Sequence, residues 1–446
     1  MTTKHRIGTA LALTAAGALC LATFGPAAFP GPASATGQST DCPRSLRCDW
    51  VPAAYQQNGD LGDKRAYGNY DLSDRPYTNR IRYLVLHDTE ERYTATLRIF
   101  QDPARSASAH FVVRSRDGHT TQMVRTGDIA WQSGNSYVNA HSVGIEQEGY
   151  ATAGAGWFTP QMYRSTAALV RHLADEYGIP LDRRHILGHD NVPPTSTAGT
   201  KAMHWDPGPY WDWNRFMALV GRPTVPTAAP DSRLVTVNPV FAQNLQAFRD
   251  CEKHTDLPLQ PSSAVPLYTE PSTAAPLFAD PALHPPGEAG TDCADDWGDK
   301  VSATQQAVMA ERRPGWTAIW WYGQKAWFQT PGGTRTTTPT AGTVVRPKAG
   351  RSEVQVYGVA YPEAADYPAG FTEPRTGAPL PYTIKAGQSY PGGGEAPAGY
   401  YYAPTFDSSL PYDHTYFPGR TGYVTVQIGH RVGFVKASDV DVVQVG

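Results

Sequence analysis

A short apolar run that ends in a histidine constrains the fold more than any other feature of the chain. Residues 81–86 read Ile-Arg-Tyr-Leu-Val-Leu and are followed by His87. The run is too short and too rich in strand-forming residues for an independent helix, so we predict a buried strand with His87 at its end. Residues 184–188 form a similar short run that ends in His189. Two such strands in one mixed sheet would place both imidazoles at strand ends.

A carboxylate completes a possible metal site. Asp206 begins the segment Asp-Pro-Gly-Pro, a short distance after His189. Two imidazoles and one carboxylate from separated loops, with a fourth position left open, form the ligand set of a catalytic rather than a structural zinc site. A lone histidine at a strand end is more often structural, so His87 counts as a candidate ligand only together with the other two.

Alternating strand and helix signals surround these residues. The Asp117-Gly118 pair lies between two strand-like runs and predicts a hairpin. Thr159-Pro160 is typical of a helix start and Gly178 of a helix end, and the residues between them have one apolar face. A closing helix is expected to begin near Asp212. The pattern predicts an α/β domain with a mixed central sheet flanked by helices.

The first 35 residues are typical of a secretory signal peptide. Lys4 and Arg6 precede the apolar run 7–24, and Ala33-Ser34-Ala35 forms a small-residue cleavage pattern. No other stretch is long and apolar enough to cross a bilayer. We expect a secreted protein without a membrane span once residues 1–35 are removed.

The cysteines fit an exported protein. Loss of Cys20 with the signal peptide leaves Cys42, Cys48, Cys251 and Cys293, an even number that favours two disulfides. Proximity in the sequence favours Cys42 with Cys48 and Cys251 with Cys293, while other pairings stay open. Zinc ligation by the four is the alternative, but they contain no Cys-x-x-Cys pair.

Charge and length limit the partners and the number of domains. The 446-residue chain has a formal net charge of −3, which becomes −5 when Lys4 and Arg6 leave with the signal peptide. A net negative protein is a poor partner for a phosphate backbone, so we expect no nucleic acid. A mature chain of roughly 410 residues exceeds what one core serves, so we expect a monomer of two or three domains.

Composition shifts give the expected domain boundaries. Residues 36–74 are rich in Gly, Asp, Asn and Gln and read as a lead-in pinned by a disulfide, followed by the α/β domain over 75–221. The Pro-, Thr- and Ala-rich segment 222–232 reads as a linker. Beyond it we predict two β-rich domains, 233–340 and 341–446.

The prediction of β-rich domains rests on two hairpin patterns. Residues 317–322 and 326–328 flank a Gly-containing turn, and residues 422–428 and 432–435 repeat the pattern. Their strand rhythm resembles small Src-homology-type barrels of the kind that often accompany wall hydrolases. Aromatic residues in these strands either stack on sugars or fill a barrel core, and the core is the commoner use. The residues concerned are Trp316, Trp320, Trp321 and Trp327.

Five motifs in order resemble a known family. The region of about residues 75–220 resembles the zinc-dependent N-acetylmuramoyl-L-alanine amidases (type 2 amidases), which share their fold with the peptidoglycan recognition proteins, and five ordered motifs are far less probable by chance than one. The motifs are Tyr-Leu-Val-Leu-His-Asp-Thr at 83–89, Ser-Ala-His-Phe-Val-Val at 108–113, Asn-Ala-His-Ser-Val-Gly-Ile-Glu at 139–146, Gly-His-Asp at 188–190 and Asp-Pro-Gly-Pro at 206–209.

The resemblance implies an activity and roles for individual residues. It implies that His87, His189 and Asp206 bind Zn²⁺ and that Glu146 is the general base. The expected reaction is zinc-assisted hydrolysis of the amide between the lactyl group of N-acetylmuramic acid and L-alanine in peptidoglycan. The expected location is extracellular, in association with the cell wall.

The chain also departs from the family pattern. Where relatives commonly have a lysine two positions before the aspartate, this chain has His204, which we expect either to stabilise the oxyanion or to compete with Asp206 for the metal. The connection from His189 to Asp206 is also longer than usual. Four further residues are candidates for substrate binding, although a buried structural role is about as plausible for the first: His110, Trp131, Asn139 and His141.

Two other functions share these features. A recognition protein could bind muropeptides without cutting them if the metal site were vestigial, and a zinc amidohydrolase could act on a different peptide or acyl amide. The intact set of His87, Glu146, His189 and Asp206 favours a hydrolase over a binding protein.

Overall fold

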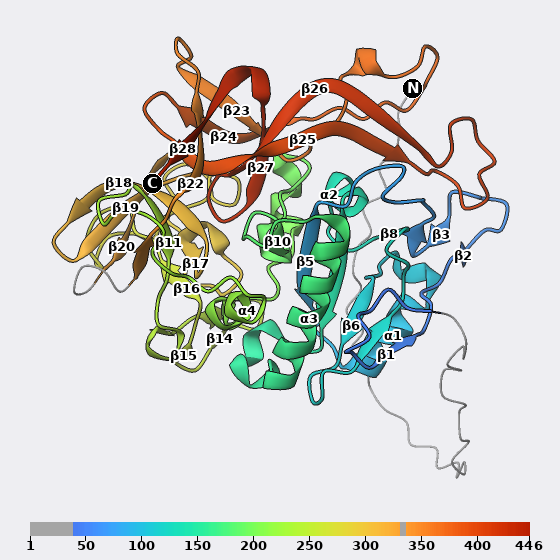
Figure 1. The fold of residues 1–446 in the computed structure, drawn as a ribbon, viewed down its shortest axis with the longest axis horizontal. Helices are drawn as coiled ribbons and strands as arrows, with labels where there is room; N and C mark the ends of the chain where they lie inside the picture. Colours follow the sequence, from blue (N-terminus) through green and yellow to red (C-terminus); the bar gives the residue numbers. More distant parts are fainter. Residues whose placement is uncertain (1–38, 331–335) are drawn as a thin grey trace. The chain divides into compact units, whose positions relative to one another are not determined.

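A six-stranded mixed sheet carries the histidine-bearing strands (Figure 1). The structure is a computed structural model, and it describes residues 39–330 and 336–446, so the expected signal peptide lies outside the described residues. The strand order is β1-β7-β6-β9-β5-β10, and β6–β7 is the antiparallel pair while the other neighbours are parallel. The strands are β1 (Cys48–Trp50), β5 (Tyr83–Asp88), β6 (Phe111–Val113), β7 (Thr120–Gln122), β9 (Ser142–Gln147) and β10 (Ile186–Gly188). The mixed α/β prediction is therefore confirmed.

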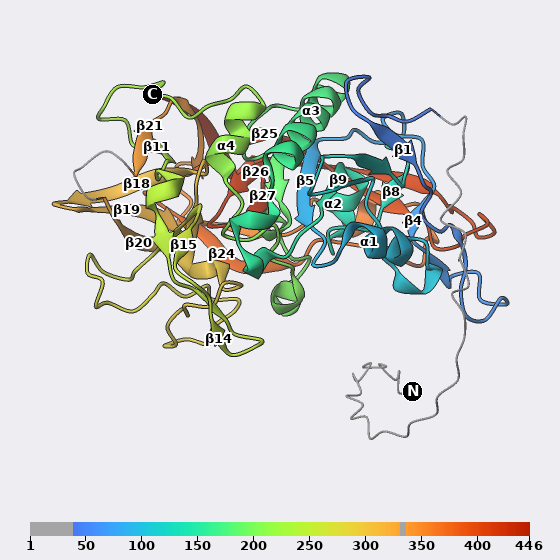
Figure 2. The same cartoon turned by 90° about the horizontal axis from the view of Figure 1, so that it is seen from below.

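The helices pack on the two faces of this sheet. Figure 2 shows α3 and α4 on one side of β5 and β9 and α1 on the other. Alternate residues such as Leu84 and Leu86 of β5 pack with α3 and α4 in one hydrophobic cluster. His87 and Glu146 belong to the opposite set of alternate residues. The helices are α1 (Tyr93–Phe100), α2 (Ser136–Ala140), α3 (Pro160–Tyr177) and α4 (Trp213–Leu219), with 3-10 turns η1 (Pro103–Arg105), η2 (Ala151–Ala153), η3 (Ala155–Trp157), η4 (His189–Asn191) and η5 (Thr197–Ala202).

Helix α3 forms for the reasons expected from its sequence. The Thr159 hydroxyl accepts a hydrogen bond from the Met162 N–H at 3.2 Å, and Pro160 occupies the first turn, where its missing N–H is harmless. Gly178 ends the helix in the left-handed conformation with φ 65°. The helix covers one face of the sheet, and His87 and Glu146 lie on the opposite face, next to the last residues of β5 and β9.

The lead-in segment is held by a disulfide and by short pairings. Cys42 and Cys48 are bonded, as are Cys251 and Cys293, so both preferred pairings are confirmed. The short strands that pair around the lead-in are β2 (Gln56–Gln57), β3 (Tyr67–Gly68), β4 (Tyr70–Asp71) and β8 (Ile129–Ala130).

A five-stranded sheet lies in the first part of the β-rich region. Its order is β20-β19-β18-β11-β21, and the expected hairpin forms from β19 and β20. The strands are β11 (Leu234–Val237), β18 (Gln306–Arg313), β19 (Trp316–Trp321), β20 (Gln324–Gln329) and β21 (Thr337–Pro339). Short pairings surround them: β12 (Leu245–Gln246), β13 (Arg249–Asp250), β14 (Thr255–Asp256), β15 (Gln260–Pro261), β16 (Ala264–Pro266) and β17 (Lys300–Ser302), with η6 (Phe241–Gln243) and η7 (Trp297–Asp299).

A seven-stranded sheet follows and contains the longest hairpin of the described residues. Its order is β24-β23-β27-β26-β25-β22-β28, and β26 pairs with β27 as the sequence predicts. The strands are β22 (Gly342–Pro347), β23 (Glu353–Tyr357), β24 (Pro379–Lys385), β25 (Tyr390–Tyr402), β26 (Thr415–Gln427), β27 (Val432–Lys436) and β28 (Val440–Val445), with η8 (Ala364–Asp366) and η9 (Ala437–Asp439). The β-rich character is thus confirmed, while closure into small barrels stays a prediction.

The β-rich core is shared between the two sheets. One hydrophobic cluster includes Val237 and Ile319 of the first sheet together with Val345 and Val426 of the second. Trp321 and Trp327 are buried, which favours the core interpretation for these two aromatics. Among the described residues, each helix is too short or too polar to span a lipid bilayer.

Candidate metal centre

Three predicted ligands converge at one end of the mixed sheet. Nδ1 of His87 lies 3.1 Å from Nδ1 of His189 and 3.2 Å from Oδ2 of Asp206, and Nδ1 of His189 lies 3.1 Å from Oδ1 of Asp206. All three side chains are buried. A tetrahedral ion with bonds of about 2.0–2.1 Å requires ligand atoms roughly 3.3 Å apart, so the spacing fits a small divalent cation.

Strand order explains the convergence. Strand β10 pairs with β5 in parallel, with Gly188 opposite Leu86, so His189 begins beside His87. Asp206 comes from the loop that follows η5, and its carboxylate Oδ2 accepts a hydrogen bond from the Asp88 N–H at 3.2 Å. Three separate segments therefore supply the three ligand atoms.

Gln132 orients the first histidine, a role that the sequence did not reveal. His87 Nε2 donates to Gln132 Oε1 at 2.8 Å, and a proton on Nε2 leaves the Nδ1 lone pair free to bind a cation. Gln132 Nε2 in turn donates to the Ser142 hydroxyl at 2.9 Å. Gly144 makes room for this amide, because a Cβ atom at that position would lie 1.8 Å from Gln132 Oε1. The relay fixes the ring that faces Asp206.

Glu146 lies beside the ligands on the neighbouring strand. It is paired in register with His87 across β9 and β5, and its side chain is partly buried. Its Oε2 atom is shielded from solvent and has no hydrogen-bond partner. Burial raises the pKa of Glu146 to about 8, although His87 lowers it and Asp206 adds to the rise. A carboxyl group in this position can hold and release a proton near neutral pH.

Burial and charge pairing act in opposite directions on the pKa values of His87 and Asp206. Burial favours the neutral form of His87, but the Glu146 and Asp206 carboxylates raise its pKa to about 9. Burial lowers the pKa of His189. Burial would raise the pKa of Asp206, but the two histidines hold that pKa well below its usual range. The set is therefore one carboxylate that stays ionised between two imidazoles, which suits a divalent cation.

His204 lies next to the group rather than within it. Its side chain is 73% exposed, and its Nδ1 atom is 3.7 Å from Asp206 Oδ1. Its ring centroid lies 4.8 Å from that of His189. This placement favours the interpretation of His204 as a group that faces substrate, and Asp206 rather than His204 belongs to the three-residue cluster.

The four predicted substrate-binding residues divide into two pairs. Trp131 and Asn139 line a cavity of about 490 Å³ that His189 and His204 also line. His110 and His141 are buried instead. The ring nitrogens of His110 face Arg75 at 2.9 Å and the Gly144 N–H at 3.0 Å.

Burial lowers the pKa values of both histidines, to about 3 for His141. His141 Nδ1 donates to the Tyr137 carbonyl at 2.8 Å. This placement favours the structural alternative for His110 and gives His141 a similar setting, while binding by Trp131 and Asn139 stays a prediction.

Residues of the β-rich region form hydrogen bonds with the loop that follows His189. His430 Nε2 donates to Asp190 Oδ2 at 2.8 Å, and both side chains are fully buried. Asn191 Nδ2 donates to the His430 carbonyl at 3.0 Å, and Arg431 donates to the Val192 carbonyl at 2.7 Å.

A tryptophan links the same histidine to the loop that carries Asp206. The Trp297 ring stacks on His430 with centroids 4.1 Å apart, and Trp297 Nε1 donates to the Trp205 carbonyl at 3.2 Å. Neighbours of two of the predicted ligands, His189 and Asp206, are thus held by residues far along the chain.

Fold and site together define a class of protein. Two histidines, an aspartate and a glutamate meet at one end of a mixed sheet. This is the architecture of a candidate metal-dependent hydrolase.

Residues 77–209 match the N-acetylmuramoyl-L-alanine amidase family. The resemblance drawn from the motifs is therefore confirmed: residues 77–209 carry a type 2 amidase domain, and this match and the named relatives support N-acetylmuramoyl-L-alanine amidase activity.

Curated relatives agree over the same region. The chain is 28% identical over 153 residues to N-acetylmuramoyl-L-alanine amidase A of Achromobacter lyticus, a match that covers 32% of this chain and 85% of that protein. It is 36% identical over 123 residues to 1,6-anhydro-N-acetylmuramyl-L-alanine amidase AmpD of Escherichia coli strain K12, over 26% of this chain and 60% of AmpD. This sequence match spans less than two thirds of the length of the E. coli protein.

Two solved structures match part of this chain. An AmpD crystal structure is 26% identical, covers 41% of this chain and 98% of its own, and has a TM-score of 0.30. A complex of the E. coli amidase AmiD with the substrate anhydro-N-acetylmuramic acid-L-Ala-D-γ-Glu-L-Lys is 22% identical, covers 37% of this chain and 68% of its own, and has a TM-score of 0.28.

Proposed function

We propose that the chain is a secreted, cell-wall-associated Zn²⁺ amidase that hydrolyses the bond between N-acetylmuramic acid and L-alanine in peptidoglycan. The convergence of His87, His189 and Asp206 beside Glu146, inside a domain of this family, carries the proposal. The bond is the one named in the matched family and in the curated relatives. The signal-like residues 1–35 and the two disulfides support export.

The donor set supports zinc as the cation. Two imidazole nitrogens and one carboxylate oxygen match the ligands of catalytic zinc sites, and buried Nδ1 atoms 3.1 Å apart are better accommodated by a shared cation than by each other. Zinc at this position would polarise the amide carbonyl and lower the pKa of a water molecule towards roughly 7. Gln132 keeps His87 in the tautomer that such binding needs.

The proton transfers fall to Glu146 in this proposal. Its carboxylate accepts a proton from the attacking water and delivers it to the departing amine of L-alanine. The unpartnered Oε2 atom and the raised pKa suit a group that must take up a proton and release it in one cycle. His204 is exposed beside Asp206 and can donate to the oxyanion that forms on the former carbonyl.

The decisive experiment is mass spectrometry of purified peptidoglycan digested by the full chain. We expect release of free stem peptides with an N-terminal L-alanine, and we expect a chelator to stop the release and added Zn²⁺ to restore it. His189→Ala should abolish both bound zinc and release. His172→Ala is the matched control, because His172 lies on α3 and pairs with Glu176 instead of the ligands.

The same experiment separates the competing functions. Binding of muropeptides without release by the zinc-loaded chain would favour a recognition protein. Hydrolysis of other amides, with muramyl peptides left intact, would favour a different amidohydrolase. Full release by metal-free protein or by His189→Ala would contradict the proposed zinc mechanism.

A further inference from the structure

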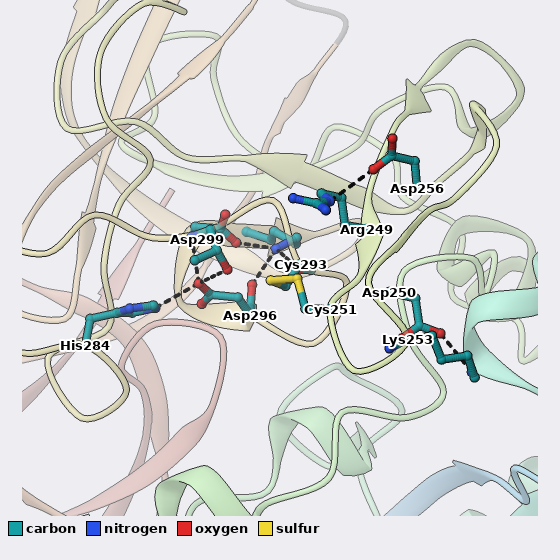
Figure 3. Close-up of a disulfide and its surroundings, with 11 residues drawn as sticks. Arg249, Asp250, Cys251, Lys253, Asp256, His284, Cys293, Asp296 and Asp299 are labelled. Carbon is teal, nitrogen blue, oxygen red and sulfur yellow. Dashed lines mark hydrogen bonds and ion pairs between the residues drawn. A yellow bond between two sulfur atoms is a disulfide. The ribbon is translucent and has the colours of Figure 1, made fainter.

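A cavity beside the metal centre has one wall from the amidase domain and one from the β-rich region. Its volume is about 590 Å³, and the amidase side includes His204 and Asp206. The opposite wall includes the Cys251–Cys293 disulfide, Leu283 and His284. Figure 3 shows this disulfide with His284 and Asp296 on the same side of it. We call this space the disulfide-side cavity.

The second wall is fixed in place. The Asp296 carboxylate accepts hydrogen bonds from His284 Nε2 at 2.8 Å and from the Thr291 N–H at 2.8 Å. Next to it, Trp297 packs with Trp205 and Tyr210 in one hydrophobic cluster. The wall is therefore anchored to the loop that carries Asp206, and its distance from the metal ligands is set by packed side chains.

A second cavity shares His204 and Met203 with the first and differs from it in chemistry. It is the cavity of about 490 Å³ that Trp131 and Asn139 line, together with Ser133 and Tyr401. Asp71 is the one carboxylate among the described residues of its lining, and Oδ1 of Asp71 accepts a hydrogen bond from the Tyr67 hydroxyl at 2.8 Å. Apart from Asp71 and two histidines, His189 and His204, the lining is uncharged and includes the Trp131 and Tyr401 rings, and we call this space the aromatic-side cavity.

Charged groups gather in the disulfide-side cavity instead. Glu90 and Lys201 line it from the amidase side, and Asp295 and Arg431 from the β-rich side. Glu90, Lys201 and Asp295 are exposed and can reach a ligand, whereas Arg431 is buried. Cations and anions on facing walls suit a ligand that carries both carboxylates and an amino group.

We propose that the disulfide-side cavity binds the stem peptide of the substrate and that the β-rich region supplies half of this subsite. The inference rests on the proposed amidase function, because the scissile bond joins a sugar unit to a peptide. The muramyl unit is uncharged once its lactyl carboxyl is in an amide, so its polar and apolar faces fit the aromatic-side cavity. The peptide carries the charges, which need charged partners when they leave water.

The test compares two substrates with the full chain. One is N-acetylmuramoyl-L-alanine and the other is the muramyl peptide with a long stem, and the measured quantity is the ratio of the KM for the long substrate to the KM for the short one. Leu283→Trp adds bulk to the β-rich wall, and we expect it to raise this ratio about tenfold. Leu259→Trp is the matched control, because Leu259 is 62% exposed elsewhere in the β-rich region.

A charge variant keeps the proposal testable if the bulky one fails to fold. Lys201→Glu reverses an exposed charge in the same cavity, and we expect it to raise the ratio about two- to fivefold at low salt and less at high salt.

An unchanged ratio in a folded Leu283→Trp protein and in Lys201→Glu would overturn the assignment. So would a rise that follows the length of the glycan instead of the peptide. Failure of the wild-type chain to cleave either substrate is a different result, which refutes the proposed function and this inference together.

Discussion

Replacement of Glu146 by glutamine should abolish catalysis and at the same time stabilise the metal-free protein. Glutamine keeps the shape of the side chain but accepts no proton, so we expect kcat to fall about 10²- to 10⁴-fold. The bound zinc and KM should change little, since Glu146 is not one of the three clustered ligands.

The stability gain follows from the raised pKa. Burial raises the pKa of Glu146 to about 8 from an unfolded value near 4.5, so the folded state holds a proton that the unfolded state has lost. Stability of the metal-free wild type therefore falls as pH rises from 4.5 towards 8, by at most about 1.4 kcal/mol per pH unit. The upper limit of this loss of stability at pH 7 is about 3 kcal/mol. Because the Glu146 side chain is partly exposed, we expect a loss of about 2 kcal/mol.

Urea unfolding of the chelator-treated proteins measures this gain. Glu146→Gln should unfold at higher urea than the wild type at pH 7, and the difference should shrink to under about 1 kcal/mol at pH 5. Glu148→Gln is the control of opposite sign, because Glu148 accepts hydrogen bonds from the Tyr93 and Ser115 N–H groups at 3.1 and 2.8 Å. It should lose about 1 kcal/mol.

Two results would refute this reasoning. Activity of Glu146→Gln within tenfold of the wild type would remove Glu146 from the proton transfers. A metal-free Glu146→Gln protein that is no more stable than the wild type at pH 7 would show that the carboxylate is well solvated in the folded state, contrary to the unpartnered Oε2 atom.

Three further predictions concern the metal and its supports. His189→Ala should lower zinc affinity by at least about 100-fold, as measured by chelator competition, and retention of zinc would exclude His189 as a ligand. His430→Ala should lower the free energy of unfolding, measured in urea, by about 3–5 kcal/mol, because it leaves the buried Asp190 carboxylate unpaired. His430→Gln retains a hydrogen-bond donor and should lose less. Equal losses in the two variants would argue against the hydrogen bond as the cause. Replacement of Cys251 and Cys293 by alanine opens a 42-residue separation and should cost about 4 kcal/mol in unfolding experiments, and a cost near zero would mean that packing alone holds the second wall.

The amidase domain could be predicted well because its sequence signals are local or lie at the ends of strands. The helix that begins at Pro160 has its cap and its terminating glycine in the sequence, and it forms within those bounds. The predicted ligands His87, His189 and Asp206 each belong to a recognisable segment, and the structure brings them together.

Other supports could not be predicted because they depend on contacts between distant segments. Gln132 belongs to none of the five motifs, and only the structure shows that its amide reaches His87 in the space left by Gly144. His430 carries no motif, and its role depends on a buried carboxylate 240 positions away.

The long hairpin was missed for a different reason. Strand β25 contains Gly-Gly-Gly and two prolines, which read as turn signals, yet it pairs with β26 through two register shifts that absorb them. The alternating pattern that identifies an ordinary strand is lost where such irregularities occur. The β-rich half was therefore predictable in class but not in its pairings.

The hydrogen bond between His430 and Asp190, in the loop after His189, has a consequence for the order in which the chain folds. Pairings of such large sequence separation form late, after shorter-range contacts have closed the intervening loops. A newly made polypeptide would thus have the segment after His189 without this buried partner until the β-rich region has folded onto it. If the proposed activity depends on that support, full activity would require the whole chain and not the amidase domain alone.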